Sequence, residues 1–164
     1  MFQDLVQIKD SGFHGFKTIE QLWNDSSAIP NQRGIYLVLT PDSSSVSFFS
    51  KGVGGYFKQK DPNVSMDTLQ SKWISGCHLI YIGQAGGNGS SATLRNRIRQ
   101  YLEFGKGKPV GHYGGRYIWQ LSNYKNLIIA WKDLPALDPR DEEKNLMHEF
   151  VGYYGRLPFA NLTF

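Results

Sequence analysis

Cysteine is almost absent from this chain of 164 residues. Cys77 stands alone, which excludes an internal disulfide and a zinc site built on several thiolates. No apolar run approaches the roughly 18–20 residues that span a bilayer, and the opening residues, MFQDLVQIKD, lack the long apolar segment of a secretory signal. We therefore expect a protein of the cytoplasm that has no membrane partner.

The remaining composition is that of an ordinary globular protein with a basic tilt. Apolar residues make up 40% of the chain and charged residues 20%, and the length suits one domain with its own core. The 18 basic and 14 acidic residues give a formal net charge of +4. This charge favours a polyanionic partner such as nucleic acid, although many other proteins carry a similar excess.

Hydrophobic periodicity predicts the order helix, strand, insertion, strand, helix, hairpin, helix. We expect helices at 18–24, 93–103 and 140–154, strands at 34–40, 78–83, 116–121 and 126–131, and an insertion at 41–77 with one strand and one or two helical turns. Thr18 and Gln21 have the spacing of a capping box, and Gly155 is placed to end the last helix. The prediction is one α+β domain over 1–164, whose small mixed or antiparallel sheet is flanked by helices.

Two tripeptides lie on predicted strands: residues 34–36 read GIY and residues 81–83 read YIG. The next predicted helix carries Arg97 within the pattern Leu-x-x-Arg-Ile-x-x-Tyr, which ends at Tyr101. On the last helix, Glu149 precedes Asn161 by twelve residues, and Pro158 comes three before that asparagine. Taken in this order, these elements resemble those of the GIY-YIG nucleases, and the resemblance extends over residues 29–161.

The resemblance implies a metal-dependent endonuclease that hydrolyses phosphodiester bonds, most naturally in DNA. Tyr36 would act as the general base for water, and a neighbouring cation such as Arg97 would have to lower the pKa of its phenol from about 10. Arg97 would also bind phosphate oxygens in the transition state. Glu149 would hold Mg²⁺ or Mn²⁺ together with water and substrate phosphate. Such a site requires the phenols, the guanidinium and the carboxylate to meet in one open groove.

The resemblance gives supporting roles to four more side chains. Tyr81 and Tyr101 would hydrogen-bond the phosphate or the attacking water, and Asn161 would pin the final segment against the site. His112 lies in the loop where some relatives place a catalytic histidine. A surface histidine is equally compatible with the sequence at that point, so both interpretations stay open.

Two acidic residues compete for the metal. Glu142 lies seven residues before Glu149 and therefore on the same helix face. The spacing to Asn161 favours Glu149. His148, next to it, points about 100° away around the helix and is not expected to be a ligand.

The chain departs from the family in two respects. The tyrosines at 36 and 81 are forty-five residues apart, far more than in many members. Gln84 follows the YIG tripeptide, the second signature of the family, at a position where many members have a lysine. A positive phosphate contact would therefore have to come from elsewhere. Lys51, Lys58 and Lys72 of the insertion are candidates. The expected nucleic-acid contacts are Gln84, Arg95, Arg97 and Arg99.

A second function class is compatible with the same residues. The chain could be a catalytically weak or inactive scaffold of this type that binds nucleic acid or a protein. By analogy with restriction enzymes of the fold, a domain of this size could also form a homodimer to reach both DNA strands.

Overall fold

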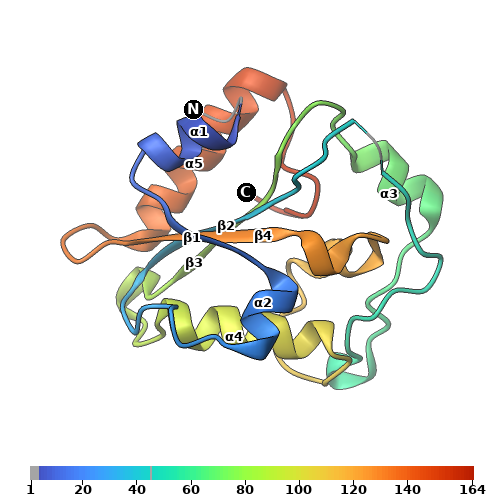
Figure 1. The fold of residues 1–164 in the computed structure, drawn as a ribbon, viewed down its shortest axis with the longest axis horizontal. Helices are drawn as coiled ribbons and strands as arrows, with labels where there is room; N and C mark the ends of the chain where they lie inside the picture. Colours follow the sequence, from blue (N-terminus) through green and yellow to red (C-terminus); the bar gives the residue numbers. More distant parts are fainter. Residues whose placement is uncertain (1–3, 45) are drawn as a thin grey trace.

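The computed structural model describes residues 4–44 and 46–164 as a single α+β domain (Figure 1). Its sheet has the order β1-β4-β2-β3, and all neighbouring strands are antiparallel. The four strands are β1 (His14–Thr18), β2 (Gly34–Leu39), β3 (Leu79–Ala85) and β4 (Ile128–Asp133). The predicted class, with an antiparallel sheet flanked by helices, is confirmed.

Helices cover both faces of the sheet (Figure 1). They are α1 (Leu5–Asp10), α2 (Ile19–Asn24), α3 (Met66–Lys72), α4 (Leu94–Gly105) and α5 (Pro139–Tyr154). In Figure 1, α1 and α5 lie on one side of the sheet, α2 and α4 lie on the other, and α3 belongs to the insertion. Within the part of the chain that the structure describes, no helix is both long enough and apolar enough to cross a bilayer.

The central strand is β2, which pairs with β3 on one side and β4 on the other. All six of its residues are buried, because helices cover both faces. Tyr36 and Val38 join the core on the α4 side, whereas Ile35 and Leu37 join the core on the α5 side. The nearly unbroken apolar run in the sequence predicted this central position correctly.

The local helix signals also predicted their structures correctly. Thr18 and Gln21 form the reciprocal capping box at the start of α2. A second capping box, made by Thr93 and Asn96, begins α4. Gly155 ends α5 in the left-handed conformation, with a φ of 74°, which glycine adopts without the steric cost of a Cβ.

The predicted hairpin at 116–131 is wrong in its first half. Residues Arg116–Gln120 form a short 3₁₀ helix, and β4 pairs with β1 and β2 instead. Four consecutive side chains of this segment are buried, from Tyr117 to Gln120, so it does not alternate between a buried and an exposed face. In the insertion, the expected strand is reduced to one isolated bridge between Phe48 and Leu121.

Two further details differ from the sequence prediction. The strand β1 has no clear pattern, because Gly15 and Phe16 both have positive φ and the register shifts there. Tyr153, an aromatic residue of the predicted helix over 140–154, is 60% exposed and does not belong to the core.

The C-terminal segment covers the outer edge of β3. The amide N–H of Ala160 donates to the Ile80 carbonyl at 2.8 Å. The Asn161 side chain accepts from the Ile82 N–H and donates to the Ile82 carbonyl, each at 2.9 Å. An edge strand whose backbone groups are paired in this way is closed to further pairing at these positions. The role expected of Asn161, pinning the final segment, is thus visible in its contacts.

Candidate active site

Three tyrosines from separate elements meet on the α4 side of the sheet. Tyr36 comes from β2, Tyr81 from β3 and Tyr101 from α4. The ring centroids lie 6.0 Å apart for Tyr36 and Tyr81, 6.3 Å for Tyr36 and Tyr101, and 5.4 Å for Tyr81 and Tyr101. The two signature tyrosines and the helix tyrosine therefore form one cluster, as the motif order led us to expect.

Two glycines make room for the phenol rings. Gly83 lies opposite Tyr36 in the β2–β3 register, and a Cβ on Gly83 would stand 2.3 Å from Cζ of Tyr36. A Cβ on Gly115 would stand 2.5 Å from the Tyr101 hydroxyl and 3.0 Å from Cζ of Tyr81. The glycine of the second signature thus has a packing reason for its place: a larger residue would displace the first tyrosine.

His112 belongs to this cluster and is not a surface histidine. Its Nε2 lies 2.7 Å from the Tyr36 hydroxyl, and its ring stacks on Tyr101 with a centroid distance of 3.9 Å. The side chain is 1% exposed, and Nδ1 has no hydrogen-bond partner among the described residues. Burial, helped by the charge of Arg97, lowers the pKa of His112 to about 3. The imidazole is therefore neutral, with a ring nitrogen facing the phenol.

Burial also determines the protonation of the phenols. It raises the pKa of Tyr36 well above its usual value of 10, and the neighbouring Tyr81 adds to the rise. The Arg97 charge acts in the opposite direction but is outweighed. Burial likewise raises the pKa of Tyr81 to about 12. The expectation that Arg97 leaves Tyr36 with a lowered pKa is therefore wrong for this structure. Desolvation of the phenolate raises the pKa more than the charge of Arg97 lowers it.

Arg97 lies half-buried on α4 beside the loop that carries His112. Its Nη1 donates to Gln100 Oε1 at 2.5 Å and to the Gly111 carbonyl at 3.5 Å. Its charge influences the pKa values of Tyr36 and His112. The guanidinium therefore lies beside the cluster, as expected.

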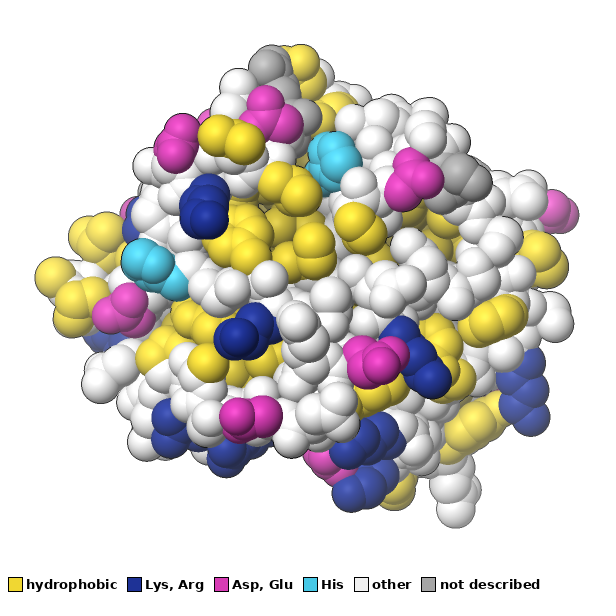
Figure 2. Space-filling view, in the orientation of Figure 1, with side chains coloured by type: hydrophobic (Ala, Val, Ile, Leu, Met, Phe, Trp, Pro, Cys, Tyr) yellow, Lys and Arg dark blue, Asp and Glu magenta, His cyan; other side chains and the backbone are white. Residues whose placement is uncertain are grey.

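Arg95 and Arg99 leave the same helix in another direction. Arg95 Nε donates to the Ile29 carbonyl and Arg99 Nε to the Ser26 hydroxyl, each at 2.9 Å. Both arginines hold the segment after α2, so the structure separates these two expected nucleic-acid contacts from Arg97. In Figure 2, Lys and Arg side chains are more numerous in the lower half of the view, the side of α2 and α4.

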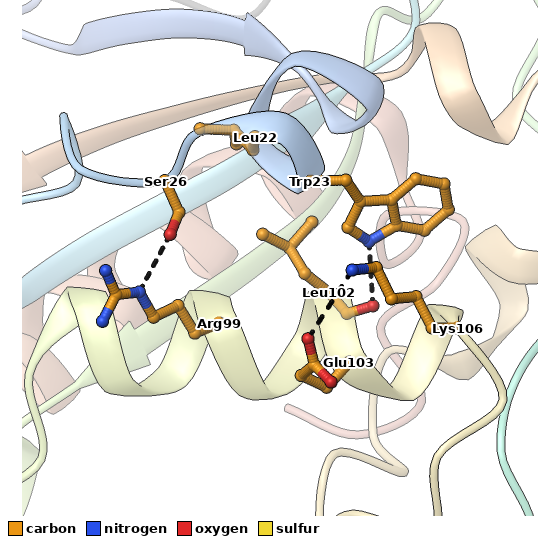
Figure 3. Close-up of a pocket in the computed structure, with 7 residues that line it drawn as sticks. All are labelled: Leu22, Trp23, Ser26, Arg99, Leu102, Glu103 and Lys106. Atoms are coloured by element: carbon orange, nitrogen blue, oxygen red, sulfur yellow. Dashed lines mark hydrogen bonds and ion pairs between the residues drawn. The ribbon is translucent and has the colours of Figure 1, made fainter.

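Arg99 also lines the hollow drawn in Figure 3, which has a volume of about 340 Å³. Its walls come from α2 and α4, where the Trp23 indole donates to the Leu102 carbonyl at 3.0 Å. Lys106 lies 5.9 Å from the Trp23 ring. None of the clustered tyrosines lines this hollow, so its size does not make it the candidate active site.

A smaller hollow, of about 160 Å³, opens beside the tyrosine cluster. Tyr81 and Asn161 line it, together with Arg140 and Glu143 from α5. Glu143 is buried, whereas Glu149 is exposed and does not line the hollow. The expectation that Glu149 lies with the phenols is therefore wrong: the carboxylate that lines this hollow with Tyr81 is Glu143.

The position of Glu143 on its helix explains why spacing alone missed it. Six residues separate Glu143 from Glu149, which turns the second carboxylate by about 240° around the helix. Glu142, the rival considered from the sequence, shares the outer face with Glu149 and accepts a hydrogen bond from Asn145. Glu143 instead belongs to the buried stripe of α5, the other members of which are Pro139, Met147 and Phe150. A carboxylate at the four-residue spacing of an apolar stripe was the signal that could have revealed it.

Glu143 makes one ion pair, and burial opposes its ionisation. Arg140 Nη1 donates to its Oε1 in an ion pair. Burial nevertheless raises the pKa of the Glu143 carboxyl, against the lowering effect of Arg140. A second positive charge at this carboxylate would offset the desolvation that its ionised form suffers.

A divalent metal ion fits this arrangement with a single protein ligand. Among the described residues, no three His, Cys, Asp or Glu side chains lie close enough to hold an ion together. Mg²⁺ commonly takes one or two carboxylates and completes its shell with water and substrate phosphate. Glu143, at the wall of a small hollow beside Tyr81, suits that pattern.

The remaining expected contacts lie outside this hollow. Gln84 Oε1 accepts from the Gly87 N–H at 2.9 Å and so stabilises a turn. As far as the structure describes the chain, neither Gln84 nor the lysines at 51, 58 and 72 line the hollow. Comparison of the chain with protein-family models, with curated proteins and with solved structures finds no match.

Proposed function

We propose that this protein is a metal-dependent endonuclease of the GIY-YIG type that hydrolyses phosphodiester bonds in DNA. The observation that carries the proposal is the convergence of Tyr36, Tyr81 and Tyr101 with His112, beside the buried carboxylate of Glu143. These five side chains come from separate parts of the sequence. Phenols, an imidazole and a carboxylate are the kinds of group that activating water and holding a phosphate require, and two of these side chains, Tyr81 and Glu143, line one small hollow.

The side chains divide the chemistry among them. Tyr81, at the wall of the hollow, donates a hydrogen bond to the phosphate or to the attacking water. Arg97 compensates the charge that builds on the phosphate oxygens in the transition state. Mg²⁺ held by Glu143 would polarise the phosphoryl group and neutralise the leaving oxygen.

Tyr36 and His112 form a route for the proton of water. The Tyr36 hydroxyl lies 2.7 Å from His112 Nε2, so the phenol can pass its proton to the imidazole as it accepts one. Burial lowers the pKa of His112, and the negative charge of a bound phosphodiester acts in the opposite direction. Tyr36 can thus serve as a relay without being ionised beforehand.

A binding module without catalysis is the second candidate, favoured by one observation. Tyr36 and His112 are each 1% exposed. Substrate in the hollow can therefore contact Tyr81 directly, whereas contact with Tyr36 or His112 requires a local rearrangement. If cleavage is absent while DNA binds, the scaffold function replaces the enzymatic one.

Matched acid variants test the proposal. Glu143→Gln and Arg97→Ala should each lower Mg²⁺- or Mn²⁺-dependent cleavage of plasmid and single-stranded DNA by about 10²- to 10³-fold, the usual loss when a transition-state contact is removed. Glu149→Gln, on the outer face of the same helix, should cleave within about twofold of wild type, as expected of a surface substitution. Cleavage that survives both Glu143→Gln and Arg97→Ala would mean that these residues are not catalytic.

A further inference from the structure

Arg140 is a guanidinium in the hollow that also holds Tyr81 and Glu143. Its Nη1 pairs with Glu143 Oε1, and its Nη2 donates to the Phe164 carbonyl at 3.5 Å. The Arg140 side chain is 29% exposed, against 12% for Glu143. Arg140 is therefore the more exposed member of the ion pair.

The two ends of the Arg140 side chain are held very differently. At the backbone, Arg140 N donates to the Asp138 cap at 2.8 Å, and Pro139 begins the helix. Gly87 packs so closely that a Cβ there would stand 2.7 Å from Cβ of Arg140. At the far end, the guanidinium makes the Glu143 ion pair and one long hydrogen bond to the Phe164 carbonyl. The guanidinium can thus change partners without moving the helix.

The ion pair and a metal ion compete for the same carboxylate. A divalent cation that binds Oε1 of Glu143 displaces the guanidinium of Arg140 and repels it. A phosphodiester drawn to the cation would then be the nearest anion, and a guanidinium binds two phosphate oxygens with its parallel N–H groups. Exchange of a carboxylate for a phosphate keeps the arginine paired throughout.

We propose that Arg140 is a phosphate-binding residue of this site, which pairs with Glu143 in this structure and turns to the nucleic-acid backbone when a divalent cation occupies the carboxylate. The inference rests on the proposed function, because it takes the cation and phosphate from that reaction. Arg140 would then be a second cationic phosphate contact besides Arg97, and it comes from α5, on the opposite side of the sheet from α4. In this arrangement, metal binding and DNA binding depend on each other.

The test measures binding rather than cleavage. Mn²⁺ affinity is followed by the electron paramagnetic resonance of free Mn²⁺, and DNA affinity by the fluorescence anisotropy of a labelled duplex in EDTA. Arg140→Gln should tighten Mn²⁺ binding by about three- to tenfold, because the cation no longer has to displace a charged hydrogen-bond partner. Arg156→Gln, the same change at the end of α5 where the guanidinium contacts the Ser71 carbonyl, should leave Mn²⁺ binding unchanged.

The DNA measurements test whether the Arg140 guanidinium binds phosphate once the Glu143 carboxylate is removed. Glu143→Gln should tighten DNA binding in EDTA by about three- to tenfold and steepen its salt dependence by close to one unit, as expected for one added phosphate contact. The double variant Glu143→Gln/Arg140→Gln should lose this gain, whereas Glu143→Gln/Arg140→Lys should keep part of it. Thermal melting of each variant verifies folding.

Two results would overturn the role of Arg140. One is Mn²⁺ binding that stays the same or weakens in Arg140→Gln; the other is equal DNA binding by Glu143→Gln and the double variant. Cleavage distinguishes this failure from that of the nuclease proposal. If wild type cleaves and depends on Glu143 while the binding pattern is absent, only the role of Arg140 fails. If the pattern is present but wild type does not cleave, only the nuclease proposal fails.

Discussion

Replacing Gly83 by alanine should disrupt the tyrosine cluster. The new Cβ would stand 2.3 Å from Cζ of Tyr36 and 2.6 Å from its hydroxyl, whereas carbon atoms pack at about 3.5–4.0 Å. The ring must therefore move by more than ~1 Å, yet Tyr81, Tyr101 and His112 surround it. Overpacking costs about 1–3 kcal/mol, and loss of the buried hydrogen bond to His112 costs a further 1–3 kcal/mol or so.

A gain partly offsets this cost, since alanine is better than glycine within a strand by roughly 0.5–1 kcal/mol. Taken together, these terms lower the expected free energy of unfolding by about 1–5 kcal/mol. Urea unfolding at neutral pH measures it. Gly152→Ala is the matched control, because Gly152 is exposed on α5 and no described atom lies within 4 Å of its added Cβ. In that variant we expect a slight stabilisation.

The reasoning fails if Gly83→Ala costs less than about 0.5 kcal/mol, the range of an ordinary surface change. A double-mutant cycle sharpens the test. Tyr36→Ala removes the ring atoms that the new Cβ meets, so Gly83→Ala should cost almost nothing in that background. A cost that persists there would place the conflict somewhere other than the phenol, and it would remove the packing explanation for the second signature.

Two further changes probe the groups around this cluster. The pKa of His112 is lowered to about 3 from an ordinary 6.5, so between these values only the unfolded chain takes up this proton. As the pH falls from 6.5 towards 3, the free energy of unfolding should therefore decrease by at most about 1.4 kcal/mol per pH unit. Unfolding curves of His112→Gln from pH 7.5 to 4.5 should lack this component, and equal slopes for variant and wild type would contradict it. Asn161→Ala leaves the N–H and carbonyl of Ile82 without the amide that binds both, so unfolding in urea should cost about 2–4 kcal/mol less. Asn145→Ala, which removes only an exposed contact to Glu142, should stay within about 0.5 kcal/mol of wild type.

Local sequence signals determined a large part of the architecture. The apolar runs around Tyr36 and Tyr81 predicted the two neighbouring strands. The capping-box spacing at Thr18 placed the start of α2, and periodicity placed the start of α4 within a residue. These features succeed because they depend on the periodicity and backbone preferences of short segments. The motif order then indicated that the tyrosines and Arg97 belong to one site.

The structure decided which other groups reach that site. His112 could be a surface or a site residue from its loop alone, and only the packing of Tyr101 against its ring resolves this. The segment Arg116–Gln120 has strand-like composition, yet it folds as a 3₁₀ helix in which the four consecutive side chains from Tyr117 to Gln120 are buried. Composition does not reveal how many sides of a segment the rest of the chain will cover.

The identity of the carboxylate beside Tyr81 and the ionisation state of Tyr36 were likewise decided by the tertiary structure. Glu142, Glu143 and Glu149 are equivalent as residue types, and the sequence orders them only along the helix axis. Which carboxylate meets Tyr81 depends on how α5 is rotated against the sheet, a property of packing between distant segments. The pKa of Tyr36 likewise depends on desolvation by residues from other elements. The amino-acid sequence by itself thus determined the central strands, most of the longer helices and the motif. Tertiary packing decided which carboxylate lies beside Tyr81, its Arg140 partner and the charge states, because burial and proximity arise only when distant segments come together.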